Sequence, residues 1–312
     1  MNEMPFRQTW ERAAAGASVQ VCEADFPLRA ALAADRACLA VITRVEGASY
    51  RPAGAAMVIT ADGTTTGSLS SGCIERDVVL HALAAIETNT PKRLIYGRGS
   101  SFIDLQLPCG GGLEITLIPH PSRPVLERAA TRLAGRRIAA VAIGEDGRLG
   151  EMPTGGDLIV RLVPGLRLLV FGKGPEPRTF AALAKAAGQD VTLYSPDAET
   201  RAGIDHAFPL NQGQWPVGVE IDDRTAVALF FHDHDWEPPL LKHALKSPAL
   251  FVGAQGSARA RQKRADALAA EGVCAAALAR LARPFGLVAS ARDPHSLAAG
   301  VLAQVMDHAR IA

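Results

Sequence analysis

The sequence lacks an excess of charge of either sign. Its 312 residues include 33 Lys and Arg against 32 Asp and Glu, a formal net charge of +1. A nucleic acid or an acidic membrane surface attracts a strongly basic protein, so we expect a partner of neither kind. Hydrophobic residues make up 48 % and charged residues 21 % of the chain, enough apolar surface to bury a core. A disordered chain is therefore excluded.

Long hydrophobic runs are also missing, and cysteines are few. No apolar stretch approaches the roughly 18 to 20 residues that a membrane-spanning helix needs. Residues 1–16 carry charges and no apolar segment of the kind found in secretory signals. The 5 cysteines are an odd number and widely scattered, which argues against a disulfide framework and for the reducing cytoplasm. At about 150 residues per domain, the length favours two domains.

Up to about Pro119 the chain is rich in turns and short strands. The Asp62-Gly63 pair is typical of a hairpin turn. The strands and helices that we expect are strands over 38–43, 55–60, 93–96, 113–118 and 137–143, and helices over 74–86 and 121–135. This mixture predicts an N-terminal α+β domain over residues 1–163.

From Leu166 the pattern changes to strand, glycine turn, helix and strand. Residues 168–171 are continuously apolar, as in a parallel strand that is covered on both faces. The elements that we expect are strands over 168–171, 190–194, 226–231 and 249–252, and helices over 180–187, 239–245 and 258–271. This alternation predicts a Rossmann-like, doubly wound parallel sheet over residues 164–312, and α/β for the whole chain.

A glycine turn follows the first strand of this second domain. Gly172 allows a sharp turn, and Gly174 allows the backbone to approach a phosphate at a helix N-terminus. Pro177 stands where the dinucleotide fingerprint has its third glycine. The strand 190–194 leads into Ser195 instead of the acidic residue that binds a ribose hydroxyl. These departures disfavour NAD and leave three interpretations: an NADP-like ligand, no ligand, or glycines that only make the turn.

Two cysteines lie where a thiolate or an anion is favoured. Cys73 precedes the predicted helix 74–86, whose N-terminus lowers the pKa of a nearby thiol. Cys109 precedes a run of three glycines, whose backbone N–H groups leave room for a bulky anion. The alternative for either is a small buried hydrophobic residue. The other cysteines lack such a setting, and we expect core packing for each: Cys22, Cys38 and Cys274.

Polar residues also follow two predicted strands of the second domain. His232, Asp233, His234 and Asp235 come at the carboxyl end of strand 226–231, where α/β domains keep their sites. Both histidines would share a strand face, but their spacing supplies no third ligand, so we expect a polar crevice lining and no metal site.

A second turn, around Gly256, precedes the predicted helix 258–271. Ser257 is a candidate helix cap. The basic residues that follow are Arg259, Arg261, Lys263 and Arg264. They predict either a phosphate or acidic-partner site, or a solvated basic face.

Six motifs follow one another in order over nearly the whole chain. They are GASYRPAGAAM at 47–57, GCIE at 72–75, CGG at 109–111, HDHD at 232–235, GAQGS at 253–257 and PFGL at 284–287. Together they resemble the XdhC/CoxI family of xanthine dehydrogenase accessory proteins. Departures from the family pattern include Ser71, Lys173 and Pro177.

The resemblance implies a protein that binds molybdenum cofactor, supports its sulfuration with a cysteine desulfurase, and delivers it to a xanthine dehydrogenase-type molybdenum hydroxylase. We expect a cofactor-binding chaperone rather than a turnover enzyme, with a homodimer as one possible assembly. Two alternatives of other classes remain open. One is an NADP-dependent oxidoreductase that uses the Rossmann half, and the other is a docking scaffold without a ligand.

The chemistry of this cofactor suggests roles for single residues. Cys73 or Cys109 would ligate molybdenum or carry a persulfide, with the other assisting. Glu75 is either a proton relay or a solvated first-turn acid, and Arg51 either binds the cofactor phosphate or forms a surface ion pair. The remaining candidates for contacts to the cofactor are Gly110, Gly111, Gly172, Gly174, His232, Asp233, Gly256 and Ser257.

Overall fold

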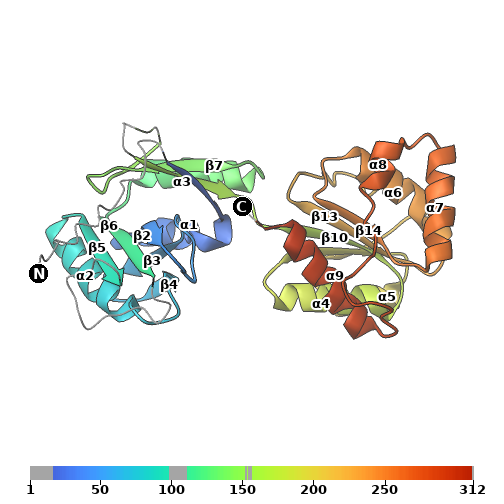
Figure 1. Ribbon diagram of the computed structural model, residues 1–312, viewed down its shortest axis with the longest axis horizontal. Coiled ribbons are helices and arrows are strands. Elements are labelled where there is room, and N and C mark those ends of the chain that lie inside the picture. Colours follow the sequence, from blue (N-terminus) through green and yellow to red (C-terminus); the bar gives the residue numbers. More distant parts are fainter. Residues whose placement is uncertain (1–16, 98–110, 152, 154–156, 311–312) are drawn as a thin grey trace, which may run out of the picture. The chain divides into compact units, whose positions relative to one another are not determined.

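The computed structural model describes residues 17–97, 111–151, 153 and 157–310. The chain forms two compact units, which are divided between Pro164 and Gly165 (Figure 1). Each unit is described here by itself. Cys109 and Gly110 lie outside the described residues.

A five-stranded antiparallel sheet organises the first unit, in the order β4-β3-β2-β6-β5. Its strands are β2 (Ala37–Glu46), β3 (Ala56–Thr60), β4 (Thr65–Gly67), β5 (Lys92–Gly97) and β6 (Gly112–Pro119). The central strand β2 is buried on both faces: Leu39 and Val41 enter one hydrophobic core, and Ala40 and Ile42 enter the other. Helix α2 (Glu75–Thr88) covers the second of these faces.

A smaller sheet belongs to the first core, in the order β1-β9-β7-β8. Its strands are β1 (Ser18–Cys22), β7 (Ala139–Ile143), β8 (Leu149–Gly150) and β9 (Leu158–Val163). The helical segments of this layer are η1 (Glu23–Asp25), α1 (Leu28–Ala33) and α3 (Arg123–Ala134). The sequence pattern predicted α3 and β7 but neither β1 nor β9, which pair in parallel across about 140 positions of the chain.

The second unit is a doubly wound parallel sheet in the order β12-β11-β10-β13-β14, which confirms the Rossmann-like prediction. Its strands are β10 (Arg167–Gly172), β11 (Asp190–Ser195), β12 (Ala207–Pro209), β13 (Thr225–Phe230) and β14 (Phe251–Ala254). One face carries α4 (Pro175–Ala186) and α9 (Pro294–His308). The other carries α6 (Glu237–Lys246), α7 (Ala258–Ala270) and α8 (Ala275–Ala279). The short segments α5 (Ala198–Arg201) and η2 (His234–Trp236) lie in loops.

Two expectations about local structure in this unit were wrong. Helix α4 begins at Pro175 and not at residue 180, because prolines in a first helical turn lose no hydrogen bond. Strand β13 ends at Phe230, and Asp233 caps η2 by accepting a hydrogen bond from the backbone N–H of Asp235. His232 and His234 therefore do not share the face of a strand.

The cysteines divide into buried and exposed groups. Cys38 is fully buried, and burial raises the pKa of its thiol to about 12, so it is an inert core residue as expected. Cys22 is partly buried. Cys274 is exposed just before α8, which corrects the expectation of core packing.

Within the ranges that the structure describes, no helix combines the length and the apolar character needed to cross a bilayer.

Candidate functional site

Two motifs of the first unit, and Gly111 of a third, lie at one edge of its antiparallel sheet. Glu46 at the end of β2 pairs with Gly112 at the start of β6, and Gly67 at the end of β4 lies beside the start of β3. Segments 47–55 and 68–74 therefore leave the sheet from the same edge, the edge at which β6 begins. The hydroxyl of Tyr96, which pairs with Leu113 near the start of β6, donates to Oδ2 of Asp77 at 2.6 Å, so the first turn of α2 lies at this edge as well.

Gly111 packs directly against the first of these motifs. A Cβ atom at this position would collide with the carbonyl oxygens of Glu46 and Ala48. A Cβ on Gly47 would in turn lie 3.6 Å from the Cα of Gly111. Only glycine fits at position 111, and this contact brings the last residue of the Cys109-Gly110-Gly111 motif against the loop that starts at Gly47.

Cys73 is exposed on the loop that leads into α2. The hydroxyl of Ser70 accepts hydrogen bonds from the backbone N–H groups of Gly72 and Cys73, both at 3.2 Å. Gly72 has a φ of 103°, in the left-handed region that favours glycine. The loop conformation is thus held by specific bonds while the thiol itself faces solvent.

The Glu75 carboxylate fastens this loop to the first turn of α2. It accepts hydrogen bonds from the backbone N–H and the hydroxyl of Ser70 at 2.7 and 2.6 Å. Longer bonds come from the hydroxyl of Ser68 and the N–H groups of Leu69 and Ile74, each at 3.3 Å. Burial works to raise the pKa of Glu75, but the hydrogen bonds from Ser70 and its neighbours together lower it below the usual range. A carboxylate in this setting stays ionised and anchors the loop. This favours neither of the two roles considered from the sequence, a proton relay or a solvated acid in the first turn of the helix.

Arg51 lies at the same edge but is turned toward Asp25. Its Nη2 is 2.8 Å from Oδ1 of Asp25, and both side chains are about a quarter exposed, at 22 % and 28 %. The ion pair is the second of the two roles that the sequence left open. The Nε atom of Arg51 is buried and has no hydrogen-bond partner among the described residues.

In the second unit, the glycine turn after β10 is closed by the protein's own side chains. A Cβ on Gly172 would lie 2.5 Å from the carbonyl oxygen of Phe230 and 3.0 Å from Cγ of Pro177, so Pro177 fills the space beside this glycine. Gly174 has a φ of 101°, and its N–H donates to the hydroxyl of Thr200 at 2.9 Å. This amide is therefore already occupied where the fold would offer it to a phosphate.

Glu176 places a negative charge in the same first turn of α4. Its side chain is only 15 % exposed, and Oε1 lies 3.1 Å from Nε2 of His232. A carboxylate here repels the phosphates that a dinucleotide would bring to a helix N-terminus. Ser195 is fully buried at the end of β11 and supplies no ribose-binding acid. The residues of this turn do not fit NADP, and the expectation of an NADP-like ligand finds no support.

A cleft of about 700 Å³ lies instead at the carboxyl ends of β13 and β14. Among the residues that line it are His232, His234, Gly256, Ser257 and Arg261. Ser257 caps α7 by accepting a hydrogen bond from the N–H of Ala260. Asp233 belongs to the η2 cap and is not among the lining residues.

A buried ion pair fixes the walls of this cleft. Glu237 and Arg264 are 1 % and 3 % exposed, and the guanidinium donates from Nε and Nη2 to the two carboxylate oxygens at 2.7 and 2.9 Å. Nη2 also donates to the carbonyl of Gln255 at 2.6 Å, and Nδ1 of His234 lies 3.1 Å from Oε1 of Glu237. The sequence pattern missed this pair, because a charged residue in a basic run gives no sign of being buried.

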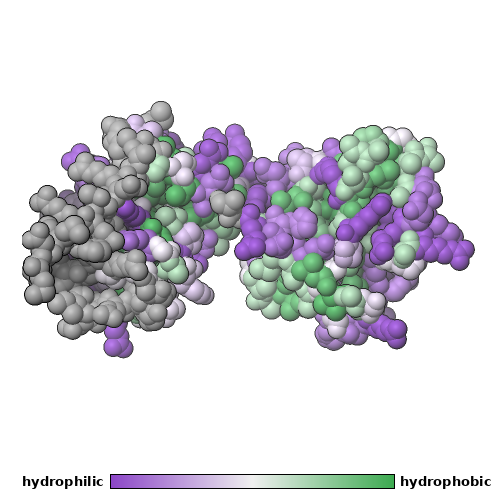
Figure 2. Space-filling view, in the orientation of Figure 1, coloured by the Kyte–Doolittle hydropathy of each residue, from purple (hydrophilic) through white to green (hydrophobic). Residues whose placement is uncertain are grey.

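The rest of the basic run remains on the surface. Arg259 and Lys263 are exposed, and hydrophilic residues gather over α7 (Figure 2). Arg264 is buried, and Arg261 is partly buried where it lines the cleft. Within the described part of the chain, no group of three or more His, Cys, Asp and Glu side chains could hold a metal ion.

Comparison with known proteins gives consistent matches along the chain. Residues 168–305 match the family model of the XdhC Rossmann domain, and residues 30–97 match that of the XdhC and CoxI family. The chain is 30 % identical over 290 residues to the molybdenum cofactor insertion chaperone PaoD of Escherichia coli (strain K12), covering 90 % of this chain and 86 % of that protein.

A second relative and a solved structure extend the likeness. The chain is 24 % identical over 314 residues to a probable xanthine dehydrogenase subunit of Bacillus subtilis (strain 168), covering 87 % of this chain and 93 % of the relative. A crystal structure described as a xanthine dehydrogenase from Bacillus halodurans superimposes with a TM-score of 0.75 at 21 % identity, covering 90 % of this chain and 94 % of the other. That structure shares the fold.

Proposed function

Because the chain belongs to the XdhC and CoxI family, we propose that it binds molybdenum cofactor as a cargo and passes it to a molybdenum hydroxylase of the xanthine dehydrogenase type. The name of the Escherichia coli relative, a molybdenum cofactor insertion chaperone, supports this role. The observation that carries the proposal is the exposed Cys73 on a loop that Glu75 fastens, at the same sheet edge as Gly47 and Gly111.

Cys73 is the ligand that we propose for the metal of the cargo. A thiolate is a soft ligand, and an exposed one on a held loop reaches a bound group without reordering the chain. The close packing of Gly111 on Ala48 leaves no side chain between the two loops. Cys109, which precedes Gly111 by two positions, is proposed to assist.

Sulfuration is the finer part of the proposal, with a cysteine desulfurase as the sulfur donor. In a chain that holds no cofactor, where Cys73 is not bound to molybdenum, its thiolate would attack the outer sulfur of the desulfurase persulfide. A new S–S bond forms at Cys73, the bond in the donor breaks, and the donor cysteine leaves as a thiolate. The step requires no external oxidant. It also requires an exposed thiol, which Cys73 provides and Cys38 does not.

Transfer of the cargo tests the proposal. The chain is loaded with molybdenum cofactor, desalted and mixed with the cofactor-free form of a xanthine dehydrogenase-type hydroxylase, and the recovered hydroxylase activity is measured. We expect Cys73→Ala to lower the recovered hydroxylase activity about tenfold or more. Losing roughly 1.4 kcal/mol of binding free energy with the metal ligand weakens binding of the cofactor tenfold. Cys274→Ala is the matched control. Cys274 is also exposed, but it belongs to the second unit, whereas Cys73 belongs to the first.

The same experiment separates a carrier from a docking scaffold. A scaffold binds the hydroxylase and stimulates its activation equally well with or without the Cys73 thiol. Full activity with Cys73→Ala and Cys109→Ala, together with retained binding to the hydroxylase, would therefore overturn the carrier role.

A further inference from the structure

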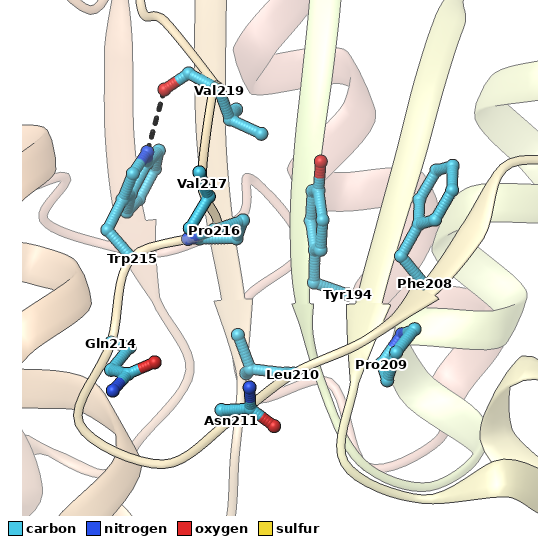
Figure 3. Close-up of a pocket in the computed structure, with 10 residues that line it drawn as sticks. All are labelled: Tyr194, Phe208, Pro209, Leu210, Asn211, Gln214, Trp215, Pro216, Val217 and Val219. Carbon is cyan, nitrogen blue, oxygen red and sulfur yellow. Dashed lines mark hydrogen bonds between the residues drawn. The ribbon is translucent and has the colours of Figure 1, made fainter.

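The connection from β12 to β13 contains no helix over residues 210–224. A crossover between parallel strands is usually helical and covers the sheet. Here an extended loop covers the sheet instead, and Leu210, Trp215 and Val219 of that loop pack into the core on the α6 face. Between the loop and strands β11 and β12 the structure leaves a hollow of about 440 Å³ (Figure 3).

The loop is held in place by Trp215. Its Nε1–H donates to the carbonyl oxygen of Val219 at 2.8 Å (Figure 3). Its ring stacks on His243 of α6 with centroids 4.3 Å apart, and the Phe171 ring lies 5.2 Å away on β10. Anchored on both the sheet and a helix, the loop cannot collapse onto Tyr194 without losing these contacts. The hollow is therefore built into the fold.

Aromatic rings form one wall of the hollow. Tyr194 stacks on Phe171 at 5.1 Å and on Phe208 at 5.9 Å. Phe208 is 46 % exposed and Val217 is 100 % exposed, so apolar surface on both sides of the hollow faces water. Covering such surface with an apolar ring removes it from water, which is favourable. The side-chain amides of Asn211 and Gln214 lie at one end of this hollow (Figure 3).

We propose that this hollow, lined by Tyr194, Phe208, Asn211, Gln214 and Val217, binds a planar heteroaromatic ring that carries hydrogen-bonding groups on its edge. The exposed ring of Phe208 offers a stacking face, and the two amides supply both donors and acceptors for the edge of the ligand. The volume lies within the range of small-molecule sites, and such sites combine apolar walls with a few polar groups. A pterin and a nucleobase share this chemistry.

This site is separate from the closed glycine turn and from the cleft beside Arg261. Of the residues that line it, none also lines that cleft. The proposal goes beyond cofactor transfer and does not depend on Cys73, since the probes that test it contain no molybdenum.

The test is a calorimetric titration of the full chain with two probes, free pterin and guanosine monophosphate. We expect saturable binding of one probe, and we expect Phe208→Ala to weaken it about tenfold, because stacking of one base on an aromatic ring contributes roughly 1 to 3 kcal/mol. Val217→Asp, at a fully exposed position, adds a charge at the hollow at little risk to folding and should also weaken binding. Met306→Ala is the matched control, since Met306 is 44 % exposed on α9, across the sheet.

The two probes distinguish the source of the ring. Pterin binding that Phe208→Ala weakens identifies a pterin ligand of this hollow, and nucleotide binding that is weakened in the same way identifies a nucleobase ligand. Absence of saturable binding by both probes at millimolar concentration overturns the proposal. Equal weakening by Phe208→Ala and Met306→Ala also overturns it. Neither result bears on cofactor transfer, which is measured with Cys73→Ala.

Discussion

Glu75 shows how a single charge organises the loop that carries Cys73. Its carboxylate gathers hydrogen bonds from Ser68, Leu69, Ser70 and Ile74, four residues on both sides of the exposed thiol. Hydrogen bonds to a charged group contribute more than those between neutral groups. The Cys73 thiol consequently has a defined position although it makes few contacts of its own.

Replacing Glu75 should reveal this role in the pH dependence of stability. The folded-state pKa of Glu75 is lowered, so its stabilising effect is complete above the unfolded-state pKa of about 4.3 and is lost as the pH falls through the folded-state pKa. We expect Glu75→Gln to cost about 1 to 3 kcal/mol at pH 7. The difference from wild type should shrink below about pH 4. Chemical unfolding followed by circular dichroism at several pH values measures it.

Glu87→Gln supplies the control for this experiment. Glu87 lies near the other end of α2 and pairs with Arg36 at the surface, where both side chains are more than half exposed. Such pairs contribute roughly 0 to 1 kcal/mol. A stability difference for Glu75→Gln that stays constant from pH 7 to pH 3 would contradict the anchoring role.

Residue roles were predictable where they follow from local sequence. The position of Cys73 ahead of a helix is visible in the pattern, since α2 begins two residues later. The pairing of Arg51 with Asp25 and the burial of Arg264 were not predictable. They depend on contacts across 26 and 27 positions, which no local pattern contains.

Among the elements, α6 and α7 are joined by the buried pair of Glu237 and Arg264. The pair also holds the turn at Gln255 and the ring of His234, so the wall of the cleft depends on it. Removing one member of a buried pair leaves an uncompensated charge, whereas removing both does not.

A double-mutant comparison tests this dependence. Arg264→Met should destabilise the second unit by about 3 to 5 kcal/mol. The double variant Glu237→Gln with Arg264→Met should lose less stability than Arg264→Met alone, because neither charge of the buried pair remains. Denaturant unfolding followed by tryptophan fluorescence reports on this unit, where Trp215 and Trp236 lie. A double variant that is no more stable than Arg264→Met would show that the charge is not the cause.

Elements were predicted best where the hydrophobic pattern is strong. Strands β10 and β13 are apolar over most of their length, and these two and β11 agree with the expected ranges within two residues. The crossover 210–224 and the pairing of β1 with β9 were not predicted. The first lacks the helix that the fold usually provides, and the second joins segments whose proximity only the tertiary structure determines.

For the whole molecule, the Rossmann-like fold alone would suggest dinucleotide binding at the glycine turn, and the residues of that turn argue against it. The Rossmann-like unit has its phosphate-binding turn closed by Glu176 and Thr200. The residues that we propose to hold the cargo are in the first unit, around the exposed Cys73. The function therefore follows from the residues at the sites and not from the fold class.

Retention of cofactor by the purified chain tests the central claim most directly. The chain is incubated with molybdenum cofactor and desalted, and bound molybdenum and pterin are quantified for wild type, Cys73→Ala, Cys109→Ala and the control Cys274→Ala. We expect equimolar molybdenum and pterin on wild type and on Cys274→Ala, with loss of molybdenum from Cys73→Ala. Wild-type chain that emerges without molybdenum or pterin, or a Cys73→Ala variant that retains both fully, would contradict the account.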